Sequence, residues 1–92
     1  MPSYLVETYL ARGHAEESAA RDRRARLAAE ELTRERARVR FEQSIHVPGD
    51  EICFYVFDAP SAGVAARAAR RAGLDPIRVV EAVSSPRKKE EK

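Results

Sequence analysis

Two side chains that could bind a metal, His46 and Cys53, are placed opposite each other by a predicted β-hairpin. Residues 39–47 and 52–57 alternate in polarity, and we expect a tight turn centred on Gly49-Asp50 to join them. Directly opposed side chains in such a pair start about 4.5–5.5 Å apart at Cβ. Imidazole and thiolate are ligands for zinc, nickel and copper.

Two ligands do not close a metal site, although a two-fold dimer would bring two such pairs together. The alternative is that Cys53 packs as a small apolar residue beside an ordinary surface histidine. His46 and Cys53 are therefore candidates for a nickel or zinc site, and the sequence indicates no other cofactor.

Other polar side chains could line a small pocket on the same face of the hairpin. The register pairs Ser44 with Tyr55, and Glu7 and Tyr9 in the first strand could join them. A carboxylate near aromatic rings can have a raised pKa and act as a base. The alternative is that Glu7 and Glu81 pair with arginines at the sheet surface. The predicted ligand-binding residues are Glu7, Tyr9, Ser44, His46, Cys53 and Tyr55.

No residue is assigned a catalytic role, because the chain has no Cys-x-x-Cys pair, phosphate-binding glycine loop or two-histidine helical motif. Tyr55 and Phe57 have the spacing with which RNA-recognition domains stack bases. However, no basic residue or glycine precedes them in the pattern expected of such domains, and Glu42 and Glu51 stand nearby. Nucleic acid is therefore not an expected partner.

The elements that must position these residues follow a βαββαβ order. We predict strands at 4–10, 39–47, 52–57 and 77–83, and helices at about 14–35 and 61–72. Two split β-α-β units with right-handed crossovers give a ferredoxin-like α+β plait, a four-stranded antiparallel sheet with both helices on one face. The domain spans 1–83, and 84–92 is predicted to be a disordered charged tail.

The hairpin alternation defines two faces, of which we assign one to the helices. The residues assigned to the helix side are Phe41, Gln43, Ile45, Val47, Ile52, Phe54 and Val56. The opposite face, expected to be uncovered, pairs His46 with Cys53, Ser44 with Tyr55, and Glu42 with Phe57. The facing of the first and last strands stays open, because both of their faces are partly apolar.

Composition excludes several classes of protein. The 92 residues include 17 basic and 15 acidic ones, a net charge of +2, so no strongly basic surface is expected. The single cysteine excludes an internal disulfide framework and fits a cytoplasmic location. No run approaches the roughly 20 apolar residues of a membrane span, and the start lacks signal-peptide features.

Three segments carry a resemblance to a known family: Tyr-Leu-Val-Glu at 4–7, Cys-Phe-Tyr-Val-Phe-Asp-Ala-Pro-Ser at 53–61, and Ala-Ala-Arg-Arg-Ala-Gly-Leu at 68–74 with Ile-Arg-Val-Val-Glu at 77–81. Together they resemble small bacterial ferredoxin-like proteins that include nickel-binding members. The resemblance implies the same fold and dimerisation.

The nickel site of that family is not carried over. Metal-associated members tend to read His-Ser-Tyr-Val where this chain has Gln43-Ser44-Ile45-His46, and a histidine where it has Ala68. Glutamine binds nickel or zinc poorly and alanine cannot coordinate either metal.

The sequence thus predicts a small cytoplasmic homodimer that binds a transition-metal ion or a small molecule and is more a binding protein than an enzyme. The alternative is a cofactor-free dimeric enzyme of the oxygenase or isomerase type, with a pocket on the open sheet face. Glu7, Ser44, His46 and Tyr55 would be its first residues to test.

Overall fold

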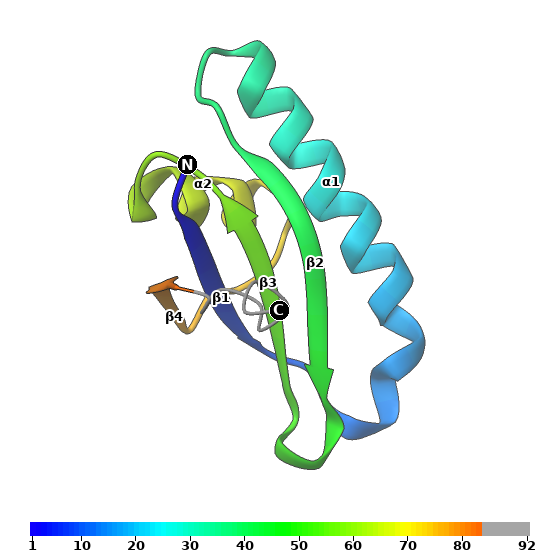
Figure 1. Ribbon diagram of the computed structural model, residues 1–92. Coiled ribbons are helices and arrows are strands. Elements are labelled where there is room, and N and C mark those ends of the chain that lie inside the picture. Colours follow the sequence, from blue (N-terminus) through cyan, green and yellow to red (C-terminus); the bar gives the residue numbers. More distant parts are fainter. Residues whose placement is uncertain (84–92) are drawn as a thin grey trace, which may run out of the picture.

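The computed structural model describes residues 1–83, and the charged tail predicted for 84–92 lies outside the described part. The main elements are β1 (Ser3–Tyr9), α1 (Ser18–Arg34), β2 (Arg40–Val47), β3 (Ile52–Asp58), α2 (Ala62–Arg71) and β4 (Arg78–Ala82) (Figure 1). There are also two short 3₁₀ helices. The first, η1 (Arg12–Glu17), precedes α1, and the second, η2 (Pro48–Asp50), joins β2 to β3. The predicted order of strands and helices is confirmed.

The four strands form one antiparallel sheet in the order β2-β3-β1-β4. Helix α1 packs on β2, α2 packs on β1 and β4, and the two helices contact each other. This is the ferredoxin-like α+β arrangement that the sequence predicts. No helix within residues 1–83 is long and apolar enough to span a membrane.

The hairpin register is confirmed from Gln43 to Val47, with His46 opposite Cys53 and Ser44 opposite Tyr55. The predicted pairing of Glu42 with Phe57 is wrong, because a β-bulge at Glu42 lets Phe41 pair with Phe57 instead. A bulge adds one residue to one strand and so reverses the alternation of side chains beyond it.

The hairpin connection is centred on Gly49-Asp50 as predicted, and the Glu51 amide donates to the Pro48 carbonyl at 3.1 Å, but its geometry is not that of a two-residue hairpin turn. Residues 48–51 form a longer connection, in which η2 begins at Pro48 and Glu51 takes a left-handed conformation with φ 56°. Proline fixes φ near −65°, which favours a right-handed helical turn rather than the left-handed turn that Gly49 could have started.

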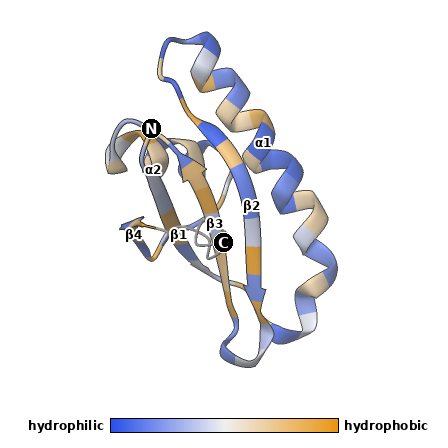
Figure 2. Ribbon diagram, in the orientation of Figure 1, coloured by the Kyte–Doolittle hydropathy of each residue, from blue (hydrophilic) through white to orange (hydrophobic). Residues whose placement is uncertain are grey.

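The assignment of the hairpin faces is wrong for most residues, and only Phe41 on the helix side and Glu42 on the open side lie where predicted. Cys53, Tyr55 and Phe57 are each 0% exposed and lie under the helices, whereas Ile45 is 43% exposed. Both faces of β3 are apolar (Figure 2), so its alternation could not decide which face the helices cover. The bulge then places Phe41 on the helix side, together with the even-numbered Ser44 and His46.

The helices bury small side chains against large ones from the sheet. The predicted stripe on α1 is confirmed, since Ala25, Ala28, Ala29 and Leu32 are all buried. Helix α2 buries only alanines on its sheet-facing side. Phe41 packs against the rings of Tyr55 and Phe57 at centroid distances of 6.2 and 5.5 Å.

Both helices end in Schellman motifs. After α2, Gly73 has φ 79° and the Leu74 amide donates to the Ala69 carbonyl. After α1, Arg36 occupies the equivalent position with φ 76°, where a side chain costs backbone strain. The Ser61 hydroxyl accepts a hydrogen bond from the Val64 amide at 3.3 Å and caps the start of α2.

Candidate functional site

The predicted metal pair, His46 and Cys53, faces the helices rather than solvent. Their cross-strand pairing is as predicted, but Cys53 is a free, fully buried thiol beneath α1. Within residues 1–83, no group of three or more His, Cys, Asp or Glu side chains is placed to hold a metal ion. The buried position instead resembles the alternative in which Cys53 packs as a small apolar residue.

His46 belongs to a set of buried polar atoms between the sheet and α1. Asp22 Oδ1, His46 Nε2 and the Tyr55 hydroxyl are buried without a hydrogen-bond partner among the described residues. Burial raises the pKa of the Tyr55 hydroxyl far above its ordinary value, the neighbouring Cys53 thiol adds to this rise, and Arg21 opposes it. Burial likewise raises the pKa of the Cys53 thiol, opposed first by the neighbouring Tyr55 hydroxyl and then by the charge of Arg21. The Tyr55 hydroxyl and the Cys53 thiol therefore stay protonated and neutral at ordinary pH.

Because Tyr55 and Phe57 are buried, they cannot stack on a nucleic-acid base. Their spacing on β3 matches that of a base-stacking platform, but the platform would need the uncovered face of the sheet. The two rings form the core instead.

The uncovered sheet face carries the remaining predicted residues, Glu7 and Tyr9. Glu7 pairs with Arg78 at 3.2 Å, as the surface ion-pair alternative for Glu7 predicts. Tyr9 is 58% exposed, and its hydroxyl lies 3.5 Å from the Glu51 carboxylate. The sheet therefore separates Glu7 and Tyr9 from Ser44, His46, Cys53 and Tyr55, and the six predicted residues do not form one pocket.

This open sheet face is mainly apolar. Leu5, Val56 and Val80 adjoin one another across β1, β3 and β4, and Glu7 adjoins Phe54 in the next row. Most of these side chains are only half-buried in the single chain. The members of the open sheet face are Ser3, Leu5, Glu7, Tyr9, Gln43, Ile45, Val47, Ile52, Phe54, Val56, Asp58, Arg78, Val80 and Ala82.

A hollow of about 370 Å³ lies in the open sheet face, with Leu5, Ile45 and Val56 among its lining residues. At one end, Asp58 accepts hydrogen bonds from Ser3 at 2.7 Å and from Arg40 at 3.1 Å. Partial burial raises the pKa of Asp58, but the interactions of its carboxylate with Glu42, Ser3 and Arg40 outweigh burial and hold the pKa below its ordinary value. The hollow therefore combines apolar walls with a charged, hydrogen-bonding end.

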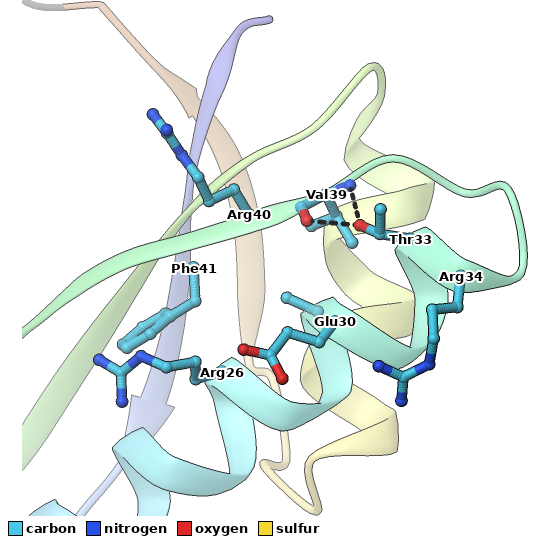
Figure 3. A pocket seen from close by; sticks show the side chains of 8 residues that line it. Arg26, Glu30, Thr33, Arg34, Val39, Arg40 and Phe41 are labelled. Carbon is cyan, nitrogen blue, oxygen red and sulfur yellow. Dashed lines mark hydrogen bonds between the residues drawn. The ribbon is translucent and has the colours of Figure 1, made fainter.

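A groove of about 470 Å³ lies elsewhere, between α1 and the edge strand β2. Its floor is apolar, and Arg26, Glu30 and Arg34 line it from α1 (Figure 3). The Arg26 guanidinium lies over the Phe41 ring, 5.5 Å from the centroid.

Sequence reasoning missed Ser3 and Asp58 as site residues. Their partnership follows from the β1–β3 register, which places Ser3 opposite Asp58, and the sequence left the facing of β1 open. Arg26 and Arg34 were missed because basic and acidic residues are interspersed along α1, so no single arginine stands out in the sequence.

Comparison with known proteins supports the fold and goes no further. No protein-family model matches the chain, and no curated protein matches it in sequence. A solved structure, the crystal structure analysis of SCO4226 from Streptomyces coelicolor A3(2), is similar, with a TM-score of 0.69 and 23% sequence identity. The match covers 91% of this chain and 99% of that one. The fold and the comparison together define the class, a small α+β protein of ferredoxin-like topology.

Proposed function

We propose that this protein is a homodimeric binding protein, in which two copies pack their open sheet faces together around a small organic ligand. The observation that carries the proposal is an apolar sheet face that no element among residues 1–83 covers. Apolar patches of this extent in soluble proteins mark interaction surfaces.

A second copy is the occupant that fits the charges of the face, and the area of the face is close to what such an interface needs. Strands about 4.8 Å apart and about seven residues long at about 3.3 Å per residue give a footprint of about 440 Å². This is near the lower limit of about 500 Å² per partner for a specific interface. Charges of both signs stand at its margins, at Glu7, Arg40, Asp58 and Arg78, and a two-fold axis can bring opposite signs together.

The chemistry of the hollow indicates the class of ligand. A volume of about 370 Å³ falls at the lower end of the range for small-molecule sites. Glu42 and Asp58 supply two carboxylates, which Arg40 only partly balances. We expect a small apolar molecule with a neutral or positively charged hydrogen-bond donor.

Nickel or zinc remains the alternative ligand. Binding through His46 and Cys53 would require α1 to move away, because both residues lie on the face that the helices cover. The free, buried thiol fits the reducing cytoplasm, where we place the dimer.

The test is the oligomeric state of matched variants in native mass spectrometry and light scattering. The wild type should be a dimer at low-micromolar concentration. Ile45→Glu, at an exposed site on the open sheet face, should be a folded monomer. Leu27→Glu makes the same change at a 53% exposed site on α1 and should remain a dimer.

A monomeric wild type, or a dimeric Ile45→Glu variant, would overturn the proposed interface. In the same spectra, a co-purified organic mass lost in Ile45→Glu supports the ligand proposal. Stoichiometric nickel or zinc without an organic mass would replace it with the metal alternative.

A further inference from the structure

We propose that the groove between α1 and β2 binds a small organic carboxylate with an apolar body. The site is separate from the open sheet face and does not depend on the proposed dimer. Its volume of about 470 Å³ is within the range of small-molecule sites. The residues that form its apolar floor are Ala29, Val39 and Phe41.

The charge of the ligand follows from two arginines that have no carboxylate partner. Within residues 1–83, no carboxylate lies within 4.0 Å of the Arg26 or Arg34 guanidinium. Arg40 differs, because it pairs with Glu42 and Asp58 and its head lies on the far side of β2 (Figure 3).

Arg26 is the anchor for the carboxylate. Its guanidinium lies over the Phe41 ring, and among residues 1–83 none of its N–H groups is paired with a carboxylate. A planar guanidinium can bind a carboxylate through two parallel hydrogen bonds. The apolar body of the ligand then lies along Val39 and Phe41.

Glu30 limits the site to a single negative charge. It follows Arg26 and precedes Arg34 by four residues each on α1, and its carboxylate points into the same space (Figure 3). Two unpartnered arginines and one glutamate leave a net charge of +1, which suits a monocarboxylate rather than a polyanion. Neutralising Glu30 should therefore strengthen binding.

An extended peptide is not the expected occupant, although β2 is an edge strand. The Thr33 hydroxyl already binds the Val39 amide at 3.2 Å and the Val39 carbonyl at 2.9 Å. Three residues further on, the bulge at Glu42 interrupts the strand edge. A peptide would find too little regular edge for strand addition.

The experiment is a titration of the full chain with phenylacetate, followed by amide chemical shifts. Phenylacetate should shift the signals of Ala29, Thr33, Val39 and Phe41. Phenethyl alcohol, which has the ring without the charge, and inorganic phosphate, which has charge without the ring, should bind at least about tenfold more weakly. The proposal would be overturned if phenethyl alcohol or phosphate bound as tightly as phenylacetate, or if phenylacetate caused no shifts.

Variants give an independent and sign-specific test. Arg26→Gln should weaken phenylacetate binding about tenfold, and Glu30→Gln should strengthen it about three- to tenfold. Arg23→Gln, the same change at an exposed residue of α1 outside the groove, should leave binding unchanged. Weakening by Arg23→Gln to the same extent as by Arg26→Gln, or any weakening by Glu30→Gln, would refute the assigned site. Circular dichroism confirms that each variant is folded.

Discussion

Removing the Tyr55 hydroxyl should stabilise the protein. This hydroxyl is fully buried between β3 and α1 and has no hydrogen-bond partner among the described residues. Burying a hydroxyl without a partner costs about 1–3 kcal/mol. Tyr55→Phe keeps the ring that packs on Phe41 and deletes only the unpartnered oxygen. After allowing for the contacts of that one atom, we expect the unfolding free energy to rise by about 1–2 kcal/mol.

The gain can be measured by urea denaturation and by thermal unfolding. With an m-value of about 1–1.5 kcal/mol per molar urea, the midpoint should move up by about 1 M at unchanged slope. The melting temperature should rise by about 5–10 °C for a domain of this size. All variants are compared at one protein concentration, because the stability of a dimer depends on it.

Tyr4→Phe is the matched control. Tyr4 lies on the same sheet face in β1, but its hydroxyl is not among the buried unpartnered atoms. Its removal should change stability by no more than about 0.5 kcal/mol. If Tyr55→Phe lowers the midpoint, or does no better than Tyr4→Phe, the hydroxyl has a favourable partner and the reasoning fails.

Three further predictions concern the helix ends and the buried thiol. Arg36→Gly should raise the unfolding free energy by about 1 kcal/mol, because it relieves the left-handed backbone strain after α1. Arg38→Gly is the control, because Arg38 does not have a positive φ, and it should give no gain. Equal urea midpoints for the two variants would contradict the prediction. Ser61→Ala should cost about 1 kcal/mol through loss of the α2 cap, which the same assay detects. Burial raises the pKa of Cys53, so the stability from its neutral thiol is complete below the ordinary value of 9.0 and is lost as pH rises through the folded value. The unfolding free energy should therefore fall as the pH rises above 9.0. The fall should be less steep in Cys53→Ala, and an equally steep fall in that variant would assign the pH dependence to other groups.

The order of elements and the hairpin register were predictable because they depend on local signals. The alanine-rich helix, the Ser61 cap and Gly73 mark helix boundaries by backbone chemistry alone. The polarity alternation of the hairpin fixed His46 opposite Cys53 without knowledge of the rest of the fold. The turn was mispredicted because Pro48 controls its conformation more strongly than Gly49 does.

The covered face of the sheet could not be read from alternation, because that is a tertiary property. Strand β3 has an apolar residue at all but its last position, so either of its faces could pack on the helices. The bulge at Glu42 also broke the alternation that seemed to unite Phe41 with Ile45. A period-two pattern identifies two faces, but only the partner layer decides which of them is buried.

The decisive signal lay in β2 and its neighbour α1. Arg21 and Asp22 of helix α1 lie close to Cys53, which pairs with His46 of β2, so the polar side of this strand faces a part of α1 that is itself polar. The match is imperfect, since Asp22 and His46 each keep an unpartnered buried atom.

Beyond the bulge, this arrangement turns the apolar residues of β2, Ile45 and Val47, away from the helices and toward solvent, whereas Phe41 before the bulge stays in the core. Such an inversion loses hydrophobic stabilisation in a single chain, because the strand buries its polar side and exposes its apolar side. It ceases to be a loss when a second copy covers the open sheet face, because Ile45 and Val47 are then buried as well. The polarity of β2 therefore supports the proposed dimer independently of the size of the face, and Ile45→Glu tests both arguments at the residue where they meet.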